Sequence, residues 1–517
     1  MASVQDVIVD TPSGRIQGLQ KRDVWQFRGI RYATAERFRA PVRVEGWDGV
    51  YDATAFGTIA PQNTSPTEAM LGAQDRPSGE DCLSLNVFTP AADGGARPVL
   101  VWIHGGGFSA GSGSVPWYDG TNLARRGDAV VVTINYRLGV LGFLHLAHLE
   151  PSLAGSGANG IRDQVAALEW VRDNIEAYGG DPGNVTVFGE SAGGMSVGTL
   201  LGTPAASGLF RGAIAQSGAT AHVHRPEAAE WVTEQVLTEL DLSPATAIDG
   251  LLEAPVDGVL AAQAAVDARR QTPEGRDVGP PVGALTYQPV VDGTVLPEPP
   301  LDAVRGGSAA GVSLVAGSTR DEWNLFHLRF RAAGPLDEAR LRHRLGALVP
   351  EERVGDVVDA YRSRRPDADP DDVICAAMTD HVFRIPASRL ATAQAPHAPR
   401  VSMYRFDYAS QMLGACHGID VPFAFDNLDR RGVEILLGDL DESSHRLAAR
   451  TAGAWLAAAR SGSPELDDLP WPAYDPDGGR LTAVLDREVG VESDPEAALR
   501  ELWDELAPVP TPGVVVD

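Results

Sequence analysis

Cysteine is scarce in this chain of 517 residues, which contains only Cys82, Cys375 and Cys416. Three cysteines are too few for a disulfide framework, and their spacing matches no metal-binding pattern. So low a cysteine content fits a reducing compartment. The N-terminus also lacks a basic segment followed by an apolar run, so it shows no signal peptide. We therefore expect a cytoplasmic protein.

Positive charge is scarce as well: the formal net charge is −27, and Lys21 is the only lysine. Nucleic acids and anionic membranes bind basic surfaces, so neither is an expected partner. No apolar stretch is long enough to span a membrane. We interpret the near absence of lysine as the codon bias of a GC-rich, bacterial genome. The hydrophobic content of 44% is ordinary for a globular protein.

A Gly-x-Ser-x-Gly motif centred on Ser191 follows four strand-forming residues, Val185–Phe188, and precedes a helix-compatible run. A serine on so sharp a strand-to-helix turn has strained backbone geometry, and Gly189 and Gly193 let the chain pass closely. The helix that begins there directs backbone N–H groups and the positive end of its dipole at the serine. The motif therefore predicts a nucleophile elbow.

Matches to so short a motif also occur by chance, and a glycine-rich turn before a helix can bind phosphate instead. The phosphate alternative is disfavoured because neither Gly-Lys-Ser/Thr nor Gly-x-Gly-x-x-Gly follows a strand here. The presence of suitable partners for Ser191 must decide between these interpretations.

Three successive glycines follow the apolar run Val99–Ile103, in the segment His104–Phe108. Their bare backbone N–H groups can approach a substrate closely, as the stabilisation of a tetrahedral oxyanion requires. A flexible glycine turn is the alternative. Because a Gly-x-Ser-x-Gly motif lies downstream, we favour an oxyanion hole.

Strand and helix patterns alternate through the chain. Apolar residues three or four apart predict a helix that opens at Asn159 and stops at Gly179-Gly180. Apolar or alternating runs predict strands within 80–88, 99–103, 128–135, 185–188, 212–219, 311–317 and 401–408. This order predicts an α/β fold with a mostly parallel central sheet and helices on both of its faces.

The remaining segments add to this core. Short apolar runs with Gly and Pro predict an N-terminal β-meander in residues 4–51, and the loop 53–79 is long enough to be functional or a lid. Helical periodicity predicts two helical insertions over the site, at about 222–286 and 323–412, in a single domain of residues 1–517. Glu442–Arg460 is predicted to be the last amphipathic helix, and the tail from Pro508 to fray.

A serine hydroxyl needs a base, and the base needs a carboxylate that fixes its tautomer and stabilises its charged form. Ser191, Glu322 and His417 occur in the chain order serine, acid, histidine that α/β-hydrolases use. Each follows a predicted strand, so we expect all three at the carboxyl edge of one sheet. Asp321 is an alternative acid.

The chain resembles the type-B carboxylesterases, which include p-nitrobenzyl esterases, liver carboxylesterases and cholinesterases. The matching segments run in family order over nearly the whole chain: Phe27–Ala33, Glu80–Val87, His104–Phe108, Asn159–Val171, Phe188–Gly194, Gln216–Gly218, Asp321-Glu322, His417-Gly418, Pro422-Phe423 and Trp471-Pro472. The resemblance implies an α/β-hydrolase fold and a monomeric serine carboxylesterase that needs no cofactor and no metal.

The resemblance also implies roles for individual residues. Ser191 would be the nucleophile, His417 the base and Glu322 the acid, and it favours Glu322 over Asp321. The oxyanion donors would be Gly106, Gly107 and Ala192. The expected walls of the substrate pocket are Phe108, Trp323, Leu325, Phe326 and Leu413. The cysteine that usually pairs with the equivalent of Cys82 is missing, so we expect Cys82 to be an inert buried thiol.

Other polar residues carry weaker expectations. His222 and His224 have no third metal ligand nearby in the sequence, so we expect them in a surface loop. His145 and His148 are expected to be packing or surface residues of a helix turn. Glu190 and Ser217 either tune the site or satisfy local backbone groups.

The leading hypothesis is the hydrolysis of neutral carboxylic esters, small molecules, through an acyl-enzyme. The same residues could cleave amides or carbamates, and a non-catalytic neuroligin-like binding protein is disfavoured because the serine, base and acid are all present. Cholinesterases hold a quaternary ammonium on aromatic faces. The stretch from Ala53 to Asp81 contains no tryptophan, and Met70-Leu71-Gly72 offers only aliphatic side chains, so choline esters are not the expected substrates.

Overall fold

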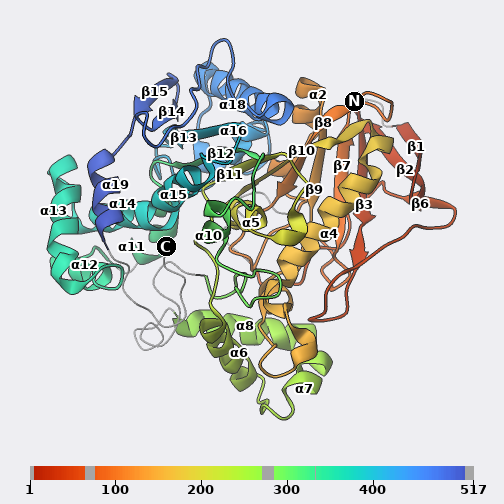
Figure 1. Ribbon diagram of the computed structural model, residues 1–517, viewed down its shortest axis with the longest axis horizontal. Coiled ribbons are helices and arrows are strands. Elements are labelled where there is room, and N and C mark those ends of the chain that lie inside the picture. Colours follow the sequence, from red (N-terminus) through yellow and green to blue (C-terminus); the bar gives the residue numbers. More distant parts are fainter. Residues whose placement is uncertain (1–4, 22, 65–75, 271–284, 332–333, 507–517) are drawn as a thin grey trace.

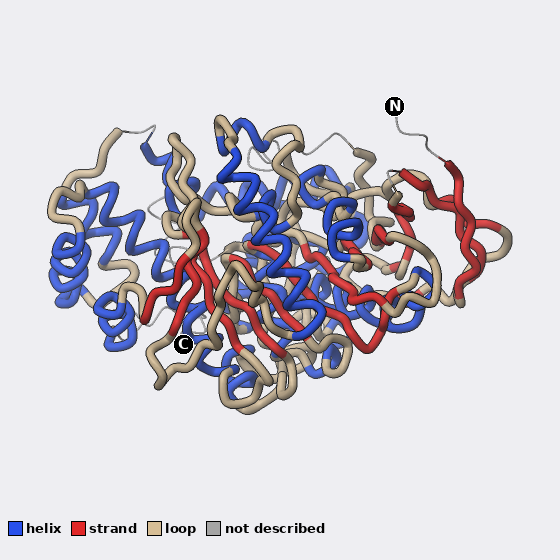
Figure 2. Tube along the Cα trace, turned by 90° about the horizontal axis from the view of Figure 1, so that it is seen from above, coloured by secondary structure: helices blue, strands red, loops and turns tan. Residues whose placement is uncertain are grey.

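The computed structural model describes residues 5–21, 23–64, 76–270, 285–331 and 334–506. Within these residues thirteen strands form one sheet in the order β1-β2-β3-β7-β9-β8-β10-β11-β12-β13-β14-β15, with β6 beside β2. The sheet crosses the molecule between helices that lie on both of its sides (Figure 2). The predicted α/β architecture is therefore confirmed.

The N-terminal part of the sheet is the predicted meander. Strands β1 (Gln5–Thr11), β2 (Gly14–Lys21) and β3 (Val24–Arg31) pair antiparallel in sequence order, and β6 (Val50–Asp52) adds to β2. A separate two-stranded pair joins β4 (Ala33–Thr34) to β5 (Val42–Arg43). The meander continues into the main sheet because β3 pairs with β7 (Ser84–Thr89).

The centre of the sheet is parallel from β9 to β14. The strands are β8 (Arg97–Ile103), β9 (Val130–Ile134), β10 (Gly180–Glu190), β11 (Gly212–Gln216), β12 (Ser313–Thr319), β13 (Val401–Phe406) and β14 (Leu481–Leu485). Every residue of β9, β11 and β12 is buried, as expected of strands covered on both faces. The sequence patterns missed β14 and the antiparallel edge strand β15 (Gly490–Ser493).

Alternate residues of the strands face two hydrophobic cores. On one side, Leu100, Trp102 and Phe188 pack with α2 (Thr121–Gly127) and α18 (Glu442–Ser461). On the other side, Val101, Val187 and Ala213 pack with α4 (Asn159–Asn174), α5 (Ala192–Leu201) and α15 (Ile385–Gln394). This alternation follows from the two-residue period of a strand.

Helix α4 confirms the predicted apolar spacing. Ile161, Val165, Leu168 and Val171 are all buried, and Ile175 continues this face in a 3₁₀ turn. Gly179 then has φ +80, the left-handed conformation that glycine adopts freely at helix ends. The next residue already belongs to β10.

The described residues of both expected insertions are mainly helical, although the second span, 323–412, also includes strand β13. The first holds α6 (Pro226–Glu239), α7 (Ala247–Glu253) and α8 (Val256–Arg270), and the second holds α11 (Trp323–Arg331), α12 (Glu338–Leu345), α13 (Val354–Arg364), α14 (Pro370–Thr379), a π-helical turn (Asp380–Arg384) and α15. Figure 1 shows α6–α8 as a group at the lower edge of the molecule. The assignment of residues 1–517 to a single domain stays a prediction.

Shorter helices complete the fold: α3 (Gly139–Phe143), α10 (Pro300–Arg305), α16 (Val421–Ala424) and α17 (Val433–Leu437). The prediction that α18 is the last helix is wrong, because α19 (Ala497–Glu505) follows it and buries Leu499 and Trp503. Met70-Leu71-Gly72 and the tail from Pro508 lie outside the described residues. In the part of the chain that the structure describes, no helix is both long and apolar enough to cross a membrane.

A buried ion pair ties α4 to the segment that follows β9. The Asp163 carboxylate accepts hydrogen bonds from Arg137 Nε at 2.8 Å, Nη2 at 2.7 Å and the Arg137 backbone N–H at 3.0 Å. The remaining guanidinium nitrogen donates to the Arg39 carbonyl oxygen. The two side chains are only 6% and 0% exposed, so neither charge has an alternative partner in solvent.

We predict that Asp163→Asn lowers the free energy of unfolding by about 3–5 kcal/mol, because the substitution leaves the buried Arg137 charge without a counter-charge. Urea unfolding followed by tryptophan fluorescence measures this loss. The matched control is Asp173→Asn on the same helix, where the ion pairs are partly exposed and the expected loss is about 0–1 kcal/mol. Equal losses in the two variants would contradict the prediction.

Candidate active site

The expected site residues lie at the carboxyl ends of parallel strands. The glycine loop follows β8, Ser191 follows β10, and Glu322 lies three residues after β12. His417 lies in the loop between β13 and α16. Because β8, β10, β11, β12 and β13 run parallel in adjacent positions, these segments meet at one edge of the sheet.

Ser191 occupies a strained turn between β10 and α5. Its backbone has φ 56 and ψ −127, a conformation that L-residues rarely adopt. The turn needs glycine neighbours because other backbone comes so close: a Cβ on Gly193 would lie 2.0 Å from the Ile103 carbonyl oxygen, and one on Gly189 would lie 2.7 Å from the same atom. The Gly-x-Ser-x-Gly spacing is therefore a packing requirement against β8.

Backbone hydrogen bonds hold Ser191 in place. Its N–H donates to the Gln216 carbonyl oxygen of β11 at 3.0 Å, and its own carbonyl oxygen accepts from the Met195 N–H in the first turn of α5. The N-terminal N–H groups of a helix have no partners within the helix, and Ala192 is the first residue of α5. The Ala192 N–H can therefore serve an anion beside Ser191.

His104, which precedes the three glycines, is held in place by Tyr136. Its ring stacks on Tyr136 at 4.5 Å between centroids, and the Tyr136 hydroxyl donates to the His104 carbonyl oxygen at 2.8 Å. Burial lowers the pKa of His104 to about 4, so the ring is neutral at pH 7. Gly106 and Gly107 have φ +108 and +61, which turns their peptide groups without steric cost.

Glu322 and His417 form a buried hydrogen-bonded pair. His417 Nδ1 lies 2.6 Å from Glu322 Oε2, and the other carboxylate oxygen accepts from the Thr319 N–H at 2.8 Å. Glu322 is fully buried and His417 is 6% exposed. This contact fixes the imidazole with Nε2 directed away from Glu322, as a base for a hydroxyl requires.

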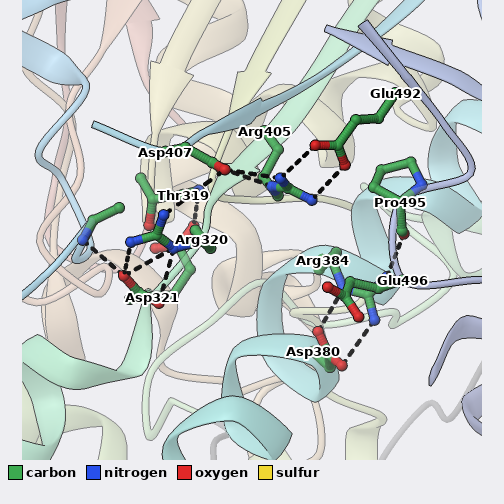
Figure 3. A network of polar contacts seen from close by, with 12 residues as sticks. Thr319, Arg320, Asp321, Asp380, Arg384, Arg405, Asp407, Glu492, Pro495 and Glu496 are labelled. Atoms are coloured by element: carbon green, nitrogen blue, oxygen red, sulfur yellow. Dashed lines mark hydrogen bonds and ion pairs between the residues drawn. The ribbon is translucent and has the colours of Figure 1, made fainter. Parts of the chain in front are cut away.

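Asp321, the alternative acid, has other partners. Its Oδ2 accepts from the Ala415 N–H and from Arg320 Nη2, both at 2.9 Å. Figure 3 shows Arg320 between Asp321 and Asp407, in a network that continues through Arg405. Asp321 thus joins the end of β12 to the loop that carries His417, and of these two adjacent acids it is Glu322 that contacts the imidazole.

A second carboxylate faces the opposite side of the imidazole. Glu190 Oε1 lies 3.1 Å from His417 Nε2, and Nε2 has no hydrogen-bond partner of good geometry among the described residues. Burial lowers the pKa of His417, but the carboxylates of Glu190 and Glu322 outweigh burial and raise this pKa above its ordinary value. The site therefore favours the imidazolium.

A polar network lies behind the histidine. The Asp420 carboxylate accepts from Gln216 Nε2 at 2.9 Å and from the Tyr404 hydroxyl at 3.0 Å, and Gln216 Oε1 accepts from Trp455 Nε1. Burial raises the pKa of Asp420 to about 6, although both hydrogen bonds oppose the shift. The network links β11 to the loop that carries His417. The Gln216 carbonyl oxygen of β11 also accepts the hydrogen bond from the Ser191 N–H.

Two aromatic rings flank the imidazole. Phe326 and Phe383 lie 4.9 and 4.8 Å from the His417 ring, and their own rings are stacked at 6.1 Å. Trp323 extends this group, 4.9 Å from Phe326. Phe383 was not among the expected pocket residues. The sequence around it offered no signal, since Phe383 lies 34 residues before His417 in an ordinary helical pattern.

The π-helical turn at Asp380–Arg384 carries Phe383. Arg384 Nε and Nη2 donate to the Asp380 carboxylate at 2.5 and 2.8 Å (Figure 3). The Tyr361 hydroxyl donates to the same carboxylate. The Trp323 N–H donates to Thr379 Oγ1 just before the turn. π-Helical turns are rare and concentrate at functional sites.

The other expected pocket residues are placed differently. Phe108 is fully buried and packs against Phe143 at 5.0 Å. Leu413 is buried in the core of the opposite face of the sheet, and Leu325 packs against that core. Leu285 was not among the expected pocket residues, but it lies beside the glycine loop. Its Cδ2 would be 3.5 Å from a Cβ built on Gly107.

The remaining polar candidates do not join this group. The expected surface position of His222 and His224 is wrong, because their side chains are buried, and His224 contacts the Thr286 carbonyl oxygen and Gln288.

Cys82 is a free, buried thiol, and burial raises its pKa to about 12, in accord with an inert residue. The Ser217 hydroxyl is buried with no hydrogen-bond partner among the described residues. His145 is buried and His148 exposed, in the turn that follows α3.

A cavity of about 410 Å³ lies beside the meander. Its wall includes Arg28, Phe56, Arg76, Ser114 and Asp119. None of the residues expected to act on a substrate lines it.

The chain matches the model of the carboxylesterase family over residues 5–503. It is 40% identical to the para-nitrobenzyl esterase of Bacillus subtilis (strain 168) over 506 residues, which cover 96% of this chain and 98% of that protein. The solved structure of a thermophilic PNB esterase superposes with a TM-score of 0.85 at 36% identity, and that of a Geobacillus stearothermophilus carboxylesterase with 0.85 at 41%; each match covers 96% of this chain and 99% of the other.

We predict that Glu190→Gln shifts the acidic limb of the pH profile to lower pH. Only the neutral imidazole can accept a proton, and removal of a negative charge 3.1 Å from Nε2 lowers the pKa of His417. The measurement is kcat/KM for a p-nitrophenyl ester against pH. Asp321→Asn is the control, because Asp321 does not contact His417, and its limb should coincide with that of the unaltered protein. An acidic limb that stays at the same pH in Glu190→Gln, or moves to higher pH, would contradict the assigned effect of Glu190 on His417.

Proposed function

The chain belongs to the carboxylesterase family and is a carboxylic ester hydrolase with the α/β-hydrolase fold, and we propose that Ser191, His417 and Glu322 carry out its reaction. The observation that carries the proposal is the buried contact of 2.6 Å between His417 Nδ1 and Glu322, at the same sheet edge as the strained turn of Ser191.

In the proposed acylation step, His417 Nε2 accepts the Ser191 hydroxyl proton while Oγ attacks the ester carbonyl carbon. Negative charge that develops on the carbonyl oxygen is stabilised by the N–H groups of Gly106, Gly107 and Ala192. The imidazolium then donates its proton to the leaving alcohol oxygen, and an acyl-serine remains. Glu322 stays ionised and stabilises the imidazolium throughout.

In the proposed deacylation step, His417 Nε2 accepts a proton from water, and the resulting hydroxide attacks the acyl carbon. Collapse of this second tetrahedral intermediate returns a proton to Ser191 Oγ and releases the acid. The Glu190 carboxylate, 3.1 Å from Nε2, favours the charged imidazolium in both steps. It also holds a proton on Nε2 at low pH, which removes the base.

We propose neutral esters of short or medium acyl chain, with apolar or aromatic groups, as the substrate class. The stacked rings of Phe326 and Phe383 and the adjacent Trp323 supply an apolar wall beside His417. The formal charge of −27 disfavours the approach of anionic esters. Trp117 cannot serve as a cation platform, because it is fully buried in the core and donates to the Arg431 carbonyl oxygen.

We further propose that the protein acts as a monomer in the cytoplasm of a bacterium. Its three described cysteines are free and buried, which suits a reducing compartment. The strongly acidic composition favours repulsion between copies.

Three substitutions test the assignment of the catalytic group. Ser191→Ala should reduce turnover on the order of 10⁶-fold, because it removes the nucleophile and little volume. Glu322→Gln should impair turnover severely, since the amide cannot stabilise the imidazolium. Asp321→Asn should have a mild effect, because Asp321 bonds to Arg320 and to the backbone of Ala415.

The measurement is kcat for p-nitrophenyl butyrate, with thermal unfolding as the control for folding. An organophosphate should label the unaltered protein once per chain and leave Ser191→Ala unlabelled. Retention of a tenth of the activity in Ser191→Ala would refute the nucleophile, and a ranking with Asp321→Asn below Glu322→Gln would move the acid to Asp321.

We predict a higher kcat/KM for p-nitrophenyl butyrate than for butyrylthiocholine, after correction for their intrinsic reactivities. A quaternary ammonium gains up to about 2 kcal/mol on desolvated aromatic faces, and the described residues place the rings of Phe326 and Phe383 against His417 rather than around an open cage. Matched amide and carbamate substrates measured in the same series test the alternative chemistry. A clear preference for the thiocholine ester would overturn the substrate class and point to Trp323 as the cation platform.

A further inference from the structure

Two histidines and a glutamate converge away from the proposed catalytic group. His145 and His148 lie in the turn that follows α3, and Glu230 lies in the first half of α6. One potential ligand atom from each residue lies within 4.8 Å of the other two. The two imidazole rings are nearly parallel, with centroids 5.8 Å apart. Segments about 80 residues apart in the chain thus present three metal-binding side chains to one point.

His145 is a buried histidine with a ring nitrogen that lacks a hydrogen-bond partner in the described part of the chain. The residue is only 3% exposed, and its Nδ1 has no hydrogen-bond partner among the described residues. A buried polar atom without a partner costs free energy unless a ligand or water satisfies it. The orphaned nitrogen is therefore a second observation, independent of the spacing of the three side chains, that points to a ligand.

The backbone around the cluster is already fixed. The His145 carbonyl oxygen accepts from Thr233 Oγ1 at 2.7 Å, and Thr233 lies on α6 three residues after Glu230. The next residue, Leu146, donates its N–H to Ser156 Oγ at 2.9 Å. These bonds hold the histidine turn against α6 before any ligand binds, so binding requires little ordering of the chain.

We propose that His145, His148 and Glu230 bind a divalent transition-metal ion, with Zn²⁺ the best match. Two imidazoles and one carboxylate form a donor set that suits zinc and leaves the fourth tetrahedral position to water, whereas Ca²⁺ and Mg²⁺ prefer oxygen ligands only. Ligands about 2.0–2.2 Å from Zn²⁺ lie about 3.3 Å apart. His148 is exposed and Glu230 half-buried, so both side chains can rotate toward the buried His145 and shorten the distances between the ligand atoms to this spacing.

The bound ion joins two parts of the fold. It connects the turn after α3, which belongs to the main body, to α6, the first helix of the insertion. An ion that binds the folded chain in preference to the unfolded chain raises the midpoint of thermal unfolding. The expected effect of the ion is therefore on stability, and the ester hydrolysis proposed above does not pass through this site.

The test uses the full chain without a histidine tag, after treatment with EDTA and desalting. ZnCl₂ is titrated in competition with a chromophoric chelator, and CoCl₂ is titrated separately, because Co²⁺ in a tetrahedral nitrogen and oxygen site gives visible absorption bands. We expect one strong equivalent of Zn²⁺ per chain and a higher unfolding midpoint in its presence. His148→Ala and Glu230→Gln should each weaken binding at least tenfold and remove the shift of the midpoint.

His445→Ala is the matched control, since His445 is an exposed histidine on α18, and it should bind Zn²⁺ like the unaltered chain. His148 and Glu230 are not fully buried, so their substitution should leave the fold and the hydrolysis of p-nitrophenyl butyrate intact. Binding that is absent, or that persists unchanged in both His148→Ala and Glu230→Gln, would overturn the proposal. Binding that persists and abolishes turnover would locate the metal at His417 instead, which also overturns it.

Discussion

The close approach of β10 and α5 to β8 at Ser191 is the constraint on which the rest of the site depends. A Cβ on Gly193 would lie 2.0 Å from the Ile103 carbonyl oxygen, so the elbow forms only where glycine allows the two backbones to meet. The same approach brings the glycine loop after β8 beside Ser191, because a Cβ on Gly105 would lie 3.0 Å from the serine Cβ. One steric requirement thus positions both the proposed nucleophile and the N–H groups expected to hold the oxyanion.

The electrostatic counterpart of this constraint is the concentration of acids around one histidine. Glu190, Glu322 and Asp420 are all buried near His417, and buried carboxylates are costly unless they are hydrogen-bonded or paired. The fold satisfies two of them with fixed donors: the Thr319 N–H for Glu322, and Gln216 and Tyr404 for Asp420. The resulting field favours a positive imidazole, which is the form that the proposed reaction transiently needs.

The helical insertions supply what the sheet cannot. Glycines and strand ends provide the catalytic edge, but the apolar wall beside His417 comes from Phe326 on α11 and Phe383 on the π-helical turn. The buried pair of Asp380 and Arg384 and the hydroxyl of Tyr361 hold that turn. The apolar wall therefore comes from a different part of the chain than Ser191 and the glycine loop.

Local sequence determined those features that depend on local periodicity and turn chemistry. The elbow at Ser191, the glycine loop, helix α4 and most strands of the sheet follow from apolar spacing and glycine placement alone, and the order of serine, acid and histidine placed the candidates on strand ends. The weakly patterned β14 and β15 were missed because β14 pairs with β13, far earlier in the chain, and β15 pairs with β14 at the edge of the described sheet. The short helix α19, which buries Leu499 and Trp503, was missed as well.

Only the tertiary structure shows the partners of residues that are chemically alike. Asp321 and Glu322 are adjacent carboxylates, and their different partners, Arg320 and the Ala415 backbone for one and His417 for the other, come from segments more than 90 residues away or from the turn geometry. The burial of His224, the ring of Phe383 beside His417 and the convergence of His145 with Glu230 likewise depend on contacts between distant segments. Such contacts leave no periodic signal in a single sequence, because packing selects them after the local elements have formed.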